Sequence, residues 1–415
     1  MQLDNLSFIQ YHLKKCSDSE DIYQILSHKY DLGSHEIQKI LSLAIITCSS
    51  NFWKKIDYLK ELIMLIINNY GEFDKILMDS VFSLINEDDY HLAIGPCHLI
   101  KACLNSMLLD INLLKSLLLS FVKNHPFFPN QIFVPSIILF RSLSDDTEFM
   151  SELLFYLGSS IEISKNKSIN HIFLDFYWNI HKYKENECQS LIKKYYFDEC
   201  ENETYQAFIN DTVMMSNEYS TKDIGYLLLP CLANFAPSPL FLAACMGSYN
   251  CFTNILENNA DIGLKDIYNR TLIHYAIAGG DNRIIEITLS LGFKLNGTLE
   301  TLAIFHQYDL FEYIITHDLF RFCVKQKEFQ GCLINSIKAN NAVTFQKCAN
   351  LSNSTKLGDF ETSLFAACTY GRLSFLNYLL CCKDCDANIV DKFGVSYMFF
   401  HLHFIKQLKM DTLKL

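Results

Sequence analysis

Glycine and proline are scarce in this chain, which has 415 residues but only 15 glycines and 7 prolines. A β-sandwich, a β-propeller or a glycine-looped nucleotide-binding fold uses more of both residues in its turns. The chain also lacks a Gly-x-Ser-x-Gly nucleophile turn, a phosphate-binding glycine loop and a dinucleotide fingerprint. Since 50% of the residues are hydrophobic and 20% are charged, the chain can bury a core. We therefore expect a folded, mostly helical protein.

Positive charge is not concentrated in any one segment. Of the 35 basic and 46 acidic side chains, residues 231–415 carry 16 of each, which leaves 19 basic and 30 acidic ones in residues 1–230. The first part of the chain thus carries the whole net charge of −11. A nucleic-acid-binding protein needs local positive charge to displace counterions from phosphates. The sequence therefore predicts no nucleic-acid partner.

Long uninterrupted hydrophobic runs are also missing. The first residues show no basic stretch ahead of an apolar run, which argues against a secretory signal. The most apolar segments, residues 59–67 and 111–122, are broken by polar residues before they reach the roughly 20 apolar positions of a membrane helix. We expect no membrane span and a cytoplasmic or nuclear location. The 16 cysteines are then expected to stay reduced and to act as small buried hydrophobic side chains.

The second half of the chain contains a segment that recurs. Its three clearest copies start at Ser238, Thr271 and Thr362, and each reaches a glycine nine residues later after an apolar, alanine-containing stretch. The hydroxyl residue suits the N-cap of a helix, and Pro239 suits the first helical position. The glycine suits a left-handed turn at the end of that helix. The copies therefore predict short helices joined by tight turns.

These segments resemble the ankyrin repeat, whose period is about 33 residues and whose signature is Thr-Pro-Leu-His-x-Ala. Thr-Leu-Ile-His-Tyr-Ala, which begins at Thr271, is similar to it, and so is the Asp-x-x-Asn-x-Thr sequence that begins at Asp266. The resemblance implies an all-α fold in which paired antiparallel helices with short hairpin loops stack as an ankyrin-repeat solenoid. We count about six units in residues 231–415, of which three are degenerate. In one of them Gln307 stands where glycine is expected.

Residues 1–230 show helical periodicity but no clean period between helices. Apolar residues recur at three- and four-residue spacing after Ser34, which predicts a one-sided helix there. Further helices are predicted over residues 53–67, 73–85, 99–122, 149–157, 169–183 and 204–215. We therefore expect a divergent all-helical region in residues 1–230, made either of decayed repeat units or of an unrelated helical domain.

Side chains capable of catalysis or metal binding do not form a matching set. His274 has phenylalanine at the corresponding positions of the other copies, so we interpret it as joining neighbouring turns. Cys382 and Cys385 have zinc-like spacing, but His401 and His403 do not complete the usual second half of a zinc site. We expect no metal, no cofactor, no small-molecule substrate and no enzymatic activity.

Binding of other proteins is the function that the resemblance implies. In ankyrin proteins, the hairpin tips and the first helices line a concave groove that receives partner proteins. Tyrosine, phenylalanine and arginine are suited to such a surface because each buries a large area at modest entropic cost. The candidate partner-binding residues are the tip positions Lys265, Ile267, Tyr268, Arg270, Lys392 and Phe393 and the first-helix positions Met246, Tyr275 and Tyr370.

Two other functions are compatible with the sequence. One is a two-partner adaptor, in which the acidic residues 1–230 recruit an enzyme complex. Separate partners for residues 1–230 and 231–415 would favour it. The other is an enzyme with an unrecognised active site in residues 1–230. A pocket of histidine, cysteine and carboxylate side chains between Trp53 and Trp178 would favour that one.

Overall fold

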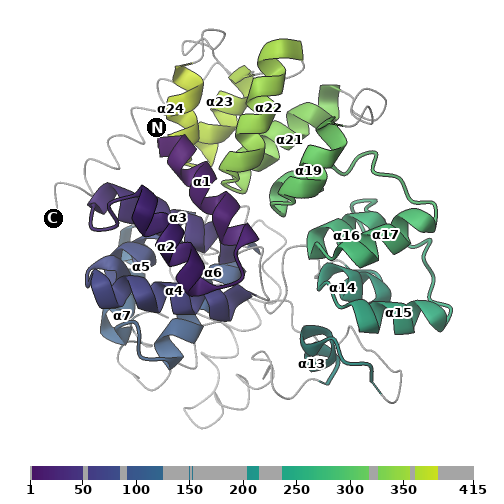
Figure 1. Cartoon of the computed structure of the whole chain (residues 1–415), viewed down its shortest axis with the longest axis horizontal. Coiled ribbons are helices and arrows are strands. Elements are labelled where there is room, and N and C mark those ends of the chain that lie inside the picture. The colour runs from purple at the N-terminus through teal and green to yellow at the C-terminus, as the bar shows by residue number, and fades with distance from the viewer. Residues whose placement is uncertain are drawn as a thin grey trace. The chain divides into compact units, whose positions relative to one another are not determined.

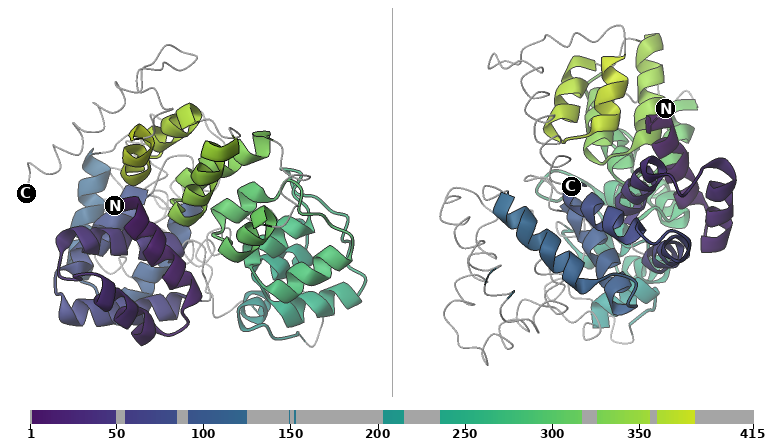
Figure 2. Two further views of the ribbon diagram at one scale, coloured as in Figure 1. Left: turned by 45° about the horizontal axis from the view of Figure 1, so that its top comes forward. Right: turned by 90° about the vertical axis from the view of Figure 1, so that its left-hand side faces the viewer.

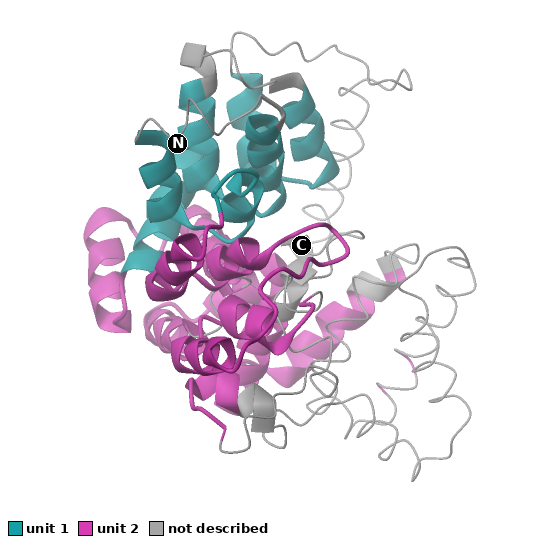
Figure 3. Cartoon of the chain, turned by 90° about the vertical axis from the view of Figure 1, so that its right-hand side faces the viewer, with its two compact units in different colours: residues 1–15, 294–415 teal, residues 16–293 magenta. Residues whose placement is uncertain are grey.

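The computed structural model describes residues 2–49, 55–84, 91–124, 149, 152, 203–214, 236–316, 326–355 and 360–381. The regular elements within these ranges are helices, which confirms the predicted all-α class. The chain divides into two compact units, drawn in different colours in Figure 3. Unit 1 comprises residues 1–15 and 294–415, and unit 2 comprises residues 16–293. The predicted boundary at residue 230 lies outside the described ranges, so the two predicted domains stay a prediction.

The described helices of unit 2 fall into two groups along the chain (Figure 1). The first group is α2 (Ser19–Lys29), α3 (His35–Ser49), α4 (Ile56–Asn69), α5 (Phe73–Leu84), α6 (His91–Asn105) and α7 (Ile111–Asn124). The second group is α13 (Glu203–Asn210), α14 (Pro239–Cys245), α15 (Tyr249–Glu257), α16 (Leu272–Gly279) and α17 (Asn282–Ser290). The described helices of unit 1 are α1 (Gln2–Lys15), α18 (Leu299–Ile304), α19 (Tyr308–Thr316), α21 (Gln326–Lys338), α22 (Ala342–Thr355), α23 (Phe360–Thr369) and α24 (Leu373–Leu380).

The first group of unit 2 is arranged in two rows of helices. Helices α2, α4 and α6 pack in one row, and helices α3, α5 and α7 pack in a second row. The helices of the first row begin at residues 19, 56 and 91, which are 37 and 35 positions apart. No such period is visible in the sequence of residues 1–230. The regular spacing was hidden because it lies in the helix positions and not in a recurring residue motif.

One predicted helix of this group is two helices in the structure. The sequence predicted a continuous helix over residues 99–122, whereas α6 ends at Asn105 and α7 begins at Ile111. Met107 between them has a left-handed backbone, with φ 55°. The N–H of Leu108 then donates to the Cys103 carbonyl at 2.9 Å, which closes the end of α6. An apolar stripe alone did not reveal this break, since leucine and methionine favour helices.

The second group of unit 2 repeats one helix–turn–helix arrangement. Helix α14 packs on α15 and on α16, and α16 packs on α17, so the two pairs lie one above the other in Figure 1. Gly247 between α14 and α15 has φ 62°, and Gly280 between α16 and α17 has φ 69°. These are two of the glycines for which the sequence predicted a left-handed turn. Ser238 and Thr271 are the N-cap residues of α14 and α16, whereas Thr362 lies inside α23 and not at its start.

Helix α13 ends in the same kind of turn, although it precedes the first predicted repeat. Asp211 follows α13 with φ 53°, and the N–H of Thr212 donates to the Ala207 carbonyl at 2.9 Å. After α14, the N–H of Ser248 donates to the Ala243 carbonyl, also at 2.9 Å. The repeated turn therefore occurs at least as early as α13.

Unit 1 contains three further helix pairs within its described ranges. Helices α18, α21 and α23 pack in one row, and each also packs on its partner, α19, α22 or α24. The turns within the pairs hold His306 and Asn340, both with φ 53°, and Gly371 with φ 63°. The repeat pattern in the sequence predicted the first of these turn residues at Gln307, one position too late. The N–H of Gln307 closes the turn by donating to the Leu302 carbonyl at 3.0 Å, so the left-handed residue is the one before it.

Helix α1 packs within unit 1, although it comes from the start of the chain. It contacts α22 and α24, and the two views of Figure 2 show it beside them. Its apolar side chains on one face are buried, namely Leu3, Leu6, Ile9 and Leu13. The first residues of the chain therefore share a core with residues 294–415.

Gly279 is where α16 approaches the end of α14, and it allows a sharp test of the stacking. A β-carbon there would lie 2.0 Å from the Ala244 carbonyl oxygen and 2.9 Å from the Gly247 nitrogen. We predict that Gly279→Ala lowers the free energy of unfolding by about 3 kcal/mol, because backbone atoms cannot move aside as a side-chain end can. Gly71→Ala is the matched control, since nothing lies within 4 Å of its β-carbon. Urea denaturation would compare them, and equal losses would contradict the close approach.

Candidate binding site at the 265–270 hairpin

The hairpin that leads into α16, residues 265–270, is organised around one buried carboxylate. Asp266 Oδ1 accepts hydrogen bonds from the backbone N–H groups of Tyr268, at 2.8 Å, and Arg270, at 2.9 Å. Asp266 Oδ2 accepts from the Arg270 guanidinium at 2.6 Å and from the Tyr275 hydroxyl at 2.8 Å. The Asp266 side chain has no solvent-exposed area. Four hydrogen bonds thus hold the hairpin from its inner side.

These donors keep the carboxyl group of Asp266 ionised. Burial by itself would raise the pKa of Asp266, but the hydrogen bonds from Arg270, Tyr275 and Tyr268 lower the pKa below its ordinary value. Burial and the hydrogen bond to Asp266 raise the pKa of the Tyr275 hydroxyl well above its ordinary value. At neutral pH, Tyr275 is therefore a neutral donor to a charged acceptor, which is a strong type of hydrogen bond.

The same hairpin presents two large apolar side chains to solvent. Ile267 is 79% exposed and Tyr268 is 61% exposed, and the exposed Lys265 precedes them. The Arg270 guanidinium lies over the Tyr268 ring, 4.8 Å from its centroid, which restrains the ring. Side chains held in this way bind a partner with a smaller loss of conformational entropy than those of a mobile loop.

The structure brings four of the nine predicted binding residues together in this hairpin. Of these four, Lys265, Ile267 and Tyr268 face solvent. The Arg270 side chain is only 22% exposed and forms an ion pair with Asp266. Arg270 therefore holds the hairpin together, and the exposed surface is formed by the other three residues.

Two predicted binding residues face inward instead. Tyr275 has 0% exposed area and Met246 has 6%. The Tyr275 ring packs edge-on against Phe241 of α14, with 5.2 Å between ring centroids. The sequence suggested exposure because these helix positions vary in ankyrin proteins. In this chain the neighbouring helix and the Asp266 carboxylate cover the side chain of Tyr275.

The other predicted binding residues are not part of the hairpin. Tyr370 is half-buried at the end of α23 in unit 1, and the Lys338 ammonium lies 5.8 Å from its ring centroid. Lys392 and Phe393 lie outside the described residues. His274, which the sequence singled out, accepts a hydrogen bond from the Thr271 N–H on Nδ1 at 3.2 Å, and this bond caps the start of α16.

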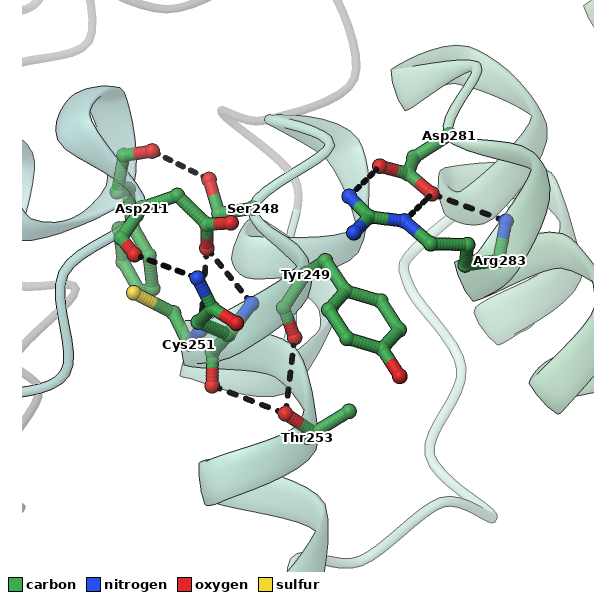
Figure 4. Close-up of polar contacts among 9 residues, drawn as sticks. Asp211, Ser248, Tyr249, Cys251, Thr253, Asp281 and Arg283 are labelled. Atoms are coloured by element: carbon green, nitrogen blue, oxygen red, sulfur yellow. Dashed lines mark hydrogen bonds and ion pairs between the residues drawn. The ribbon is translucent and has the colours of Figure 1, made fainter.

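A second polar cluster joins α13 to the next helix pair (Figure 4). One carboxylate oxygen of Asp211 accepts from the backbone N–H groups of Asn250, at 2.8 Å, and Cys251, at 3.2 Å. It thereby caps the start of α15 from a neighbouring turn. The Ser248 hydroxyl donates to the Phe208 carbonyl. These bonds satisfy backbone groups at helix ends, so we assign the cluster a structural role.

Figure 4 also shows an ion pair at the start of α17. Asp281 accepts from the Arg283 N–H at 2.9 Å and pairs with the Arg283 guanidinium at 2.7 Å. The guanidinium lies over the Tyr249 ring of the preceding pair, 4.0 Å from its centroid. This contact ties α17 to α15. It differs from the 265–270 hairpin, where the aromatic ring beside the arginine is largely exposed.

The described residues offer no metal centre and no membrane helix. No group of three or more histidine, cysteine, aspartate or glutamate residues is placed there to hold a metal ion. The candidate set of Cys382, Cys385, His401 and His403 lies outside those ranges. None of the ten described cysteines forms a disulfide, and seven of them are buried, as expected for small hydrophobic side chains. No helix in the described ranges is long and apolar enough to cross a membrane.

No family model matches the chain, and no curated protein is similar to it in sequence. The ankyrin resemblance therefore rests on the residues of this chain. The functional proposal is based on the geometry of the 265–270 hairpin and of the stacked helix pairs.

Arg270 tests whether the Asp266 carboxylate organises the hairpin. We predict that Arg270→Ala lowers the free energy of unfolding by about 3 kcal/mol, because it removes one partner of a buried ion pair and leaves the other uncompensated. Lys265→Ala removes a neighbouring exposed positive charge and should change stability by less than about 0.5 kcal/mol. Urea denaturation at pH 7 measures both, and similar values for the two variants would contradict the structural role of Arg270.

The depressed pKa of Asp266 predicts a dependence of stability on pH. Because the carboxyl group has a lower pKa in the folded chain, the unfolded chain binds more protons in acid. The stabilisation is therefore complete above the unfolded pKa of about 4 and is lost as the pH falls below it. We expect the stability difference between wild type and Asp266→Asn to shrink between pH 5 and pH 3. Denaturation curves at several pH values check this, and a constant difference would contradict it.

Proposed function

We propose that this chain is a non-enzymatic ankyrin-type module that binds partner proteins through the tip of the 265–270 hairpin. The observation that carries the proposal is the display of Ile267 and Tyr268, at 79% and 61% exposure, on a hairpin fixed by Asp266. Large apolar side chains with restrained rotamers are typical of the residues that dominate binding energy at protein interfaces.

Three features of unit 2 support the ankyrin part of the proposal. The pairs α14–α15 and α16–α17 stack on each other. Each pair turns at a left-handed glycine, Gly247 or Gly280. The Asp-x-x-Asn-x-Thr sequence forms a tight hairpin, in which the N–H of Asn269 donates to the Asp266 carbonyl at 3.0 Å and Asn269 has φ 61°. A hairpin of this kind projects from the stacked helices, where a partner can reach it.

The hairpin exposes little charge beside its apolar side chains, which suits recognition by apolar contact. The ion pair between Asp266 and Arg270 is internal to the hairpin, so Lys265 is the exposed charge next to the two apolar side chains. A partner would bury Ile267 and Tyr268 in the middle of the interface, with Lys265 at its polar rim. No cofactor, metal or small-molecule substrate enters this role.

The proposed interface is tested by substituting the two exposed apolar residues together. The full-length chain with Ile267→Ser and Tyr268→Ser should capture its partner proteins from a cell extract at least about tenfold less well than wild type. The variant should keep its thermal midpoint within about 2 °C, since the bond between Tyr268 and Asp266 uses the backbone N–H of Tyr268, which the substitution retains. Quantitative mass spectrometry of the captured proteins measures the change.

Tyr313→Ser supplies the matched control for this experiment. Tyr313 is an exposed tyrosine, at 49%, on α19 of unit 1. The control should retain the proteins that wild type captures. Unchanged capture by the double variant, or the same loss with Tyr313→Ser, would overturn the assignment of the hairpin as the interface.

A further inference from the structure

Helix α1 contacts the rest of unit 1 through hydrogen bonds and an ion pair as well as through its apolar face. The side chain of Gln10 is fully buried. Its Nε2 donates to the Asn340 carbonyl at 2.7 Å, and its Oε1 accepts from the Ala342 N–H at 3.0 Å. Asn340 is the left-handed turn residue between α21 and α22. A single side-chain amide thus satisfies a carbonyl at the end of one helix and an N–H at the start of the next.

Lys14, one helical turn after Gln10, makes the matching contact with the preceding helix pair. Its ammonium group donates to the His306 carbonyl and, at 2.8 Å, to Gln307 Oε1. It also lies 5.2 Å from the centroid of the Tyr308 ring. His306 is the left-handed turn residue between α18 and α19, so it is equivalent to Asn340 in the next pair. Two residues four positions apart in α1 therefore bind equivalent groups in two successive turns.

Two more polar contacts lie along the same helix. Lys15 pairs with Asp309 of α19 at 2.6 Å, and the Asp4 carboxylate accepts from the Gln346 side chain of α22 at 2.7 Å. The apolar face between the two ends is buried. The polar contacts fix the direction and register of α1 on α22 and at the start of α19.

A surface with this pattern selects the helix that it accepts. Any amphipathic helix can cover apolar area, but a glutamine and a lysine four residues apart also satisfy backbone groups of both turns. A helix without them leaves the Asn340 carbonyl and the Ala342 N–H without these partners, which is costly in a buried interface. Docking of an amphipathic helix on a complementary surface is an established mode of peptide recognition.

We propose that the face formed by α22, α24 and the start of α19 is a helix-recognition site, which α1 occupies reversibly and which accepts the same helix from a second copy of the chain when α1 leaves it. Each copy carries both halves of the match, the face that α1 covers and the Gln-x-x-x-Lys helix. Only residues 16–18 join α1 to α2, which belongs to unit 2. Exchange of an identical element between copies needs no new interface chemistry. This site is independent of the 265–270 hairpin.

The test uses the full-length chain and a labelled synthetic peptide of residues 2–15. Ile9→Asp with Leu13→Asp in the chain places two charges on the buried face of α1 and should release α1 from the site. The peptide should then bind to this variant at least about tenfold more tightly than to wild type, whose own α1 fills the site. Fluorescence anisotropy measures both affinities.

Peptide variants separate specific recognition from apolar docking. A peptide with Gln10→Ala and Lys14→Ala should bind the released chain at least about tenfold more weakly, whereas Asn5→Ala should stay within about threefold of the original peptide. Binding of all three peptides with equal affinity would overturn the proposal, and so would failure of the original peptide to bind a folded variant.

Hydrogen exchange in the wild-type chain provides a second measurement if the aspartate variant does not fold. Reversible release predicts that the amides of α1 exchange faster than those of α22, because α1 opens without unfolding its site. Adding excess unlabelled peptide to the wild-type chain should leave the exchange of α22 unchanged and speed that of α1. Identical exchange of α1 and α22 under all conditions would mean that α1 is a fixed part of the core and would overturn the proposal.

Discussion

From α14 to α24, the structure depends on one backbone turn that ends the first helix of each pair. A left-handed residue lets the next N–H bond back to a carbonyl of the helix it leaves, so the chain reverses within a few residues. The first helices are as short as the six residues of α18, and helices of this length are not stable alone. The turn is therefore what allows each pair to form and to cover its neighbour. It recurs in both units, at Gly247, Gly280, His306, Asn340 and Gly371.

The residue after this turn connects successive pairs. The Asn341 side chain donates to the Ala303 carbonyl at 2.7 Å, and the Arg372 guanidinium donates to the Lys338 carbonyl at 3.0 Å. Gln10 of α1 satisfies groups at the same turns from outside the stack. The proposed helix-recognition site thus uses backbone groups that the repeat itself exposes. The proposed protein-binding tip uses another recurring part, the hairpin before the first helix.

Some elements could be predicted from the sequence because their signals are local. The glycines at 247 and 280 need a left-handed backbone, and Asp266 with Asn269 encodes the hairpin. The turns at Met107 and His306 were missed or misplaced, because methionine carries no turn signal and histidine carries a weaker one than glycine. In the candidate site, the exposed Ile267 and Tyr268 were found from their place in the motif. The inward position of Tyr275 was not, because it depends on Phe241 and Asp266 as well as on spacing.

The sequence by itself determined that the chain is helical, where several helices turn, and which hairpin carries exposed apolar side chains. Helical periodicity shows that a helix has a face to bury, but it does not say which surface will cover that face. Only the tertiary structure decided that α1 packs with residues 294–415. The bond between Gln10 and Asn340 joins residues 330 positions apart. Such a pairing depends on shape and on unsatisfied backbone groups that exist only once the helix pairs have stacked.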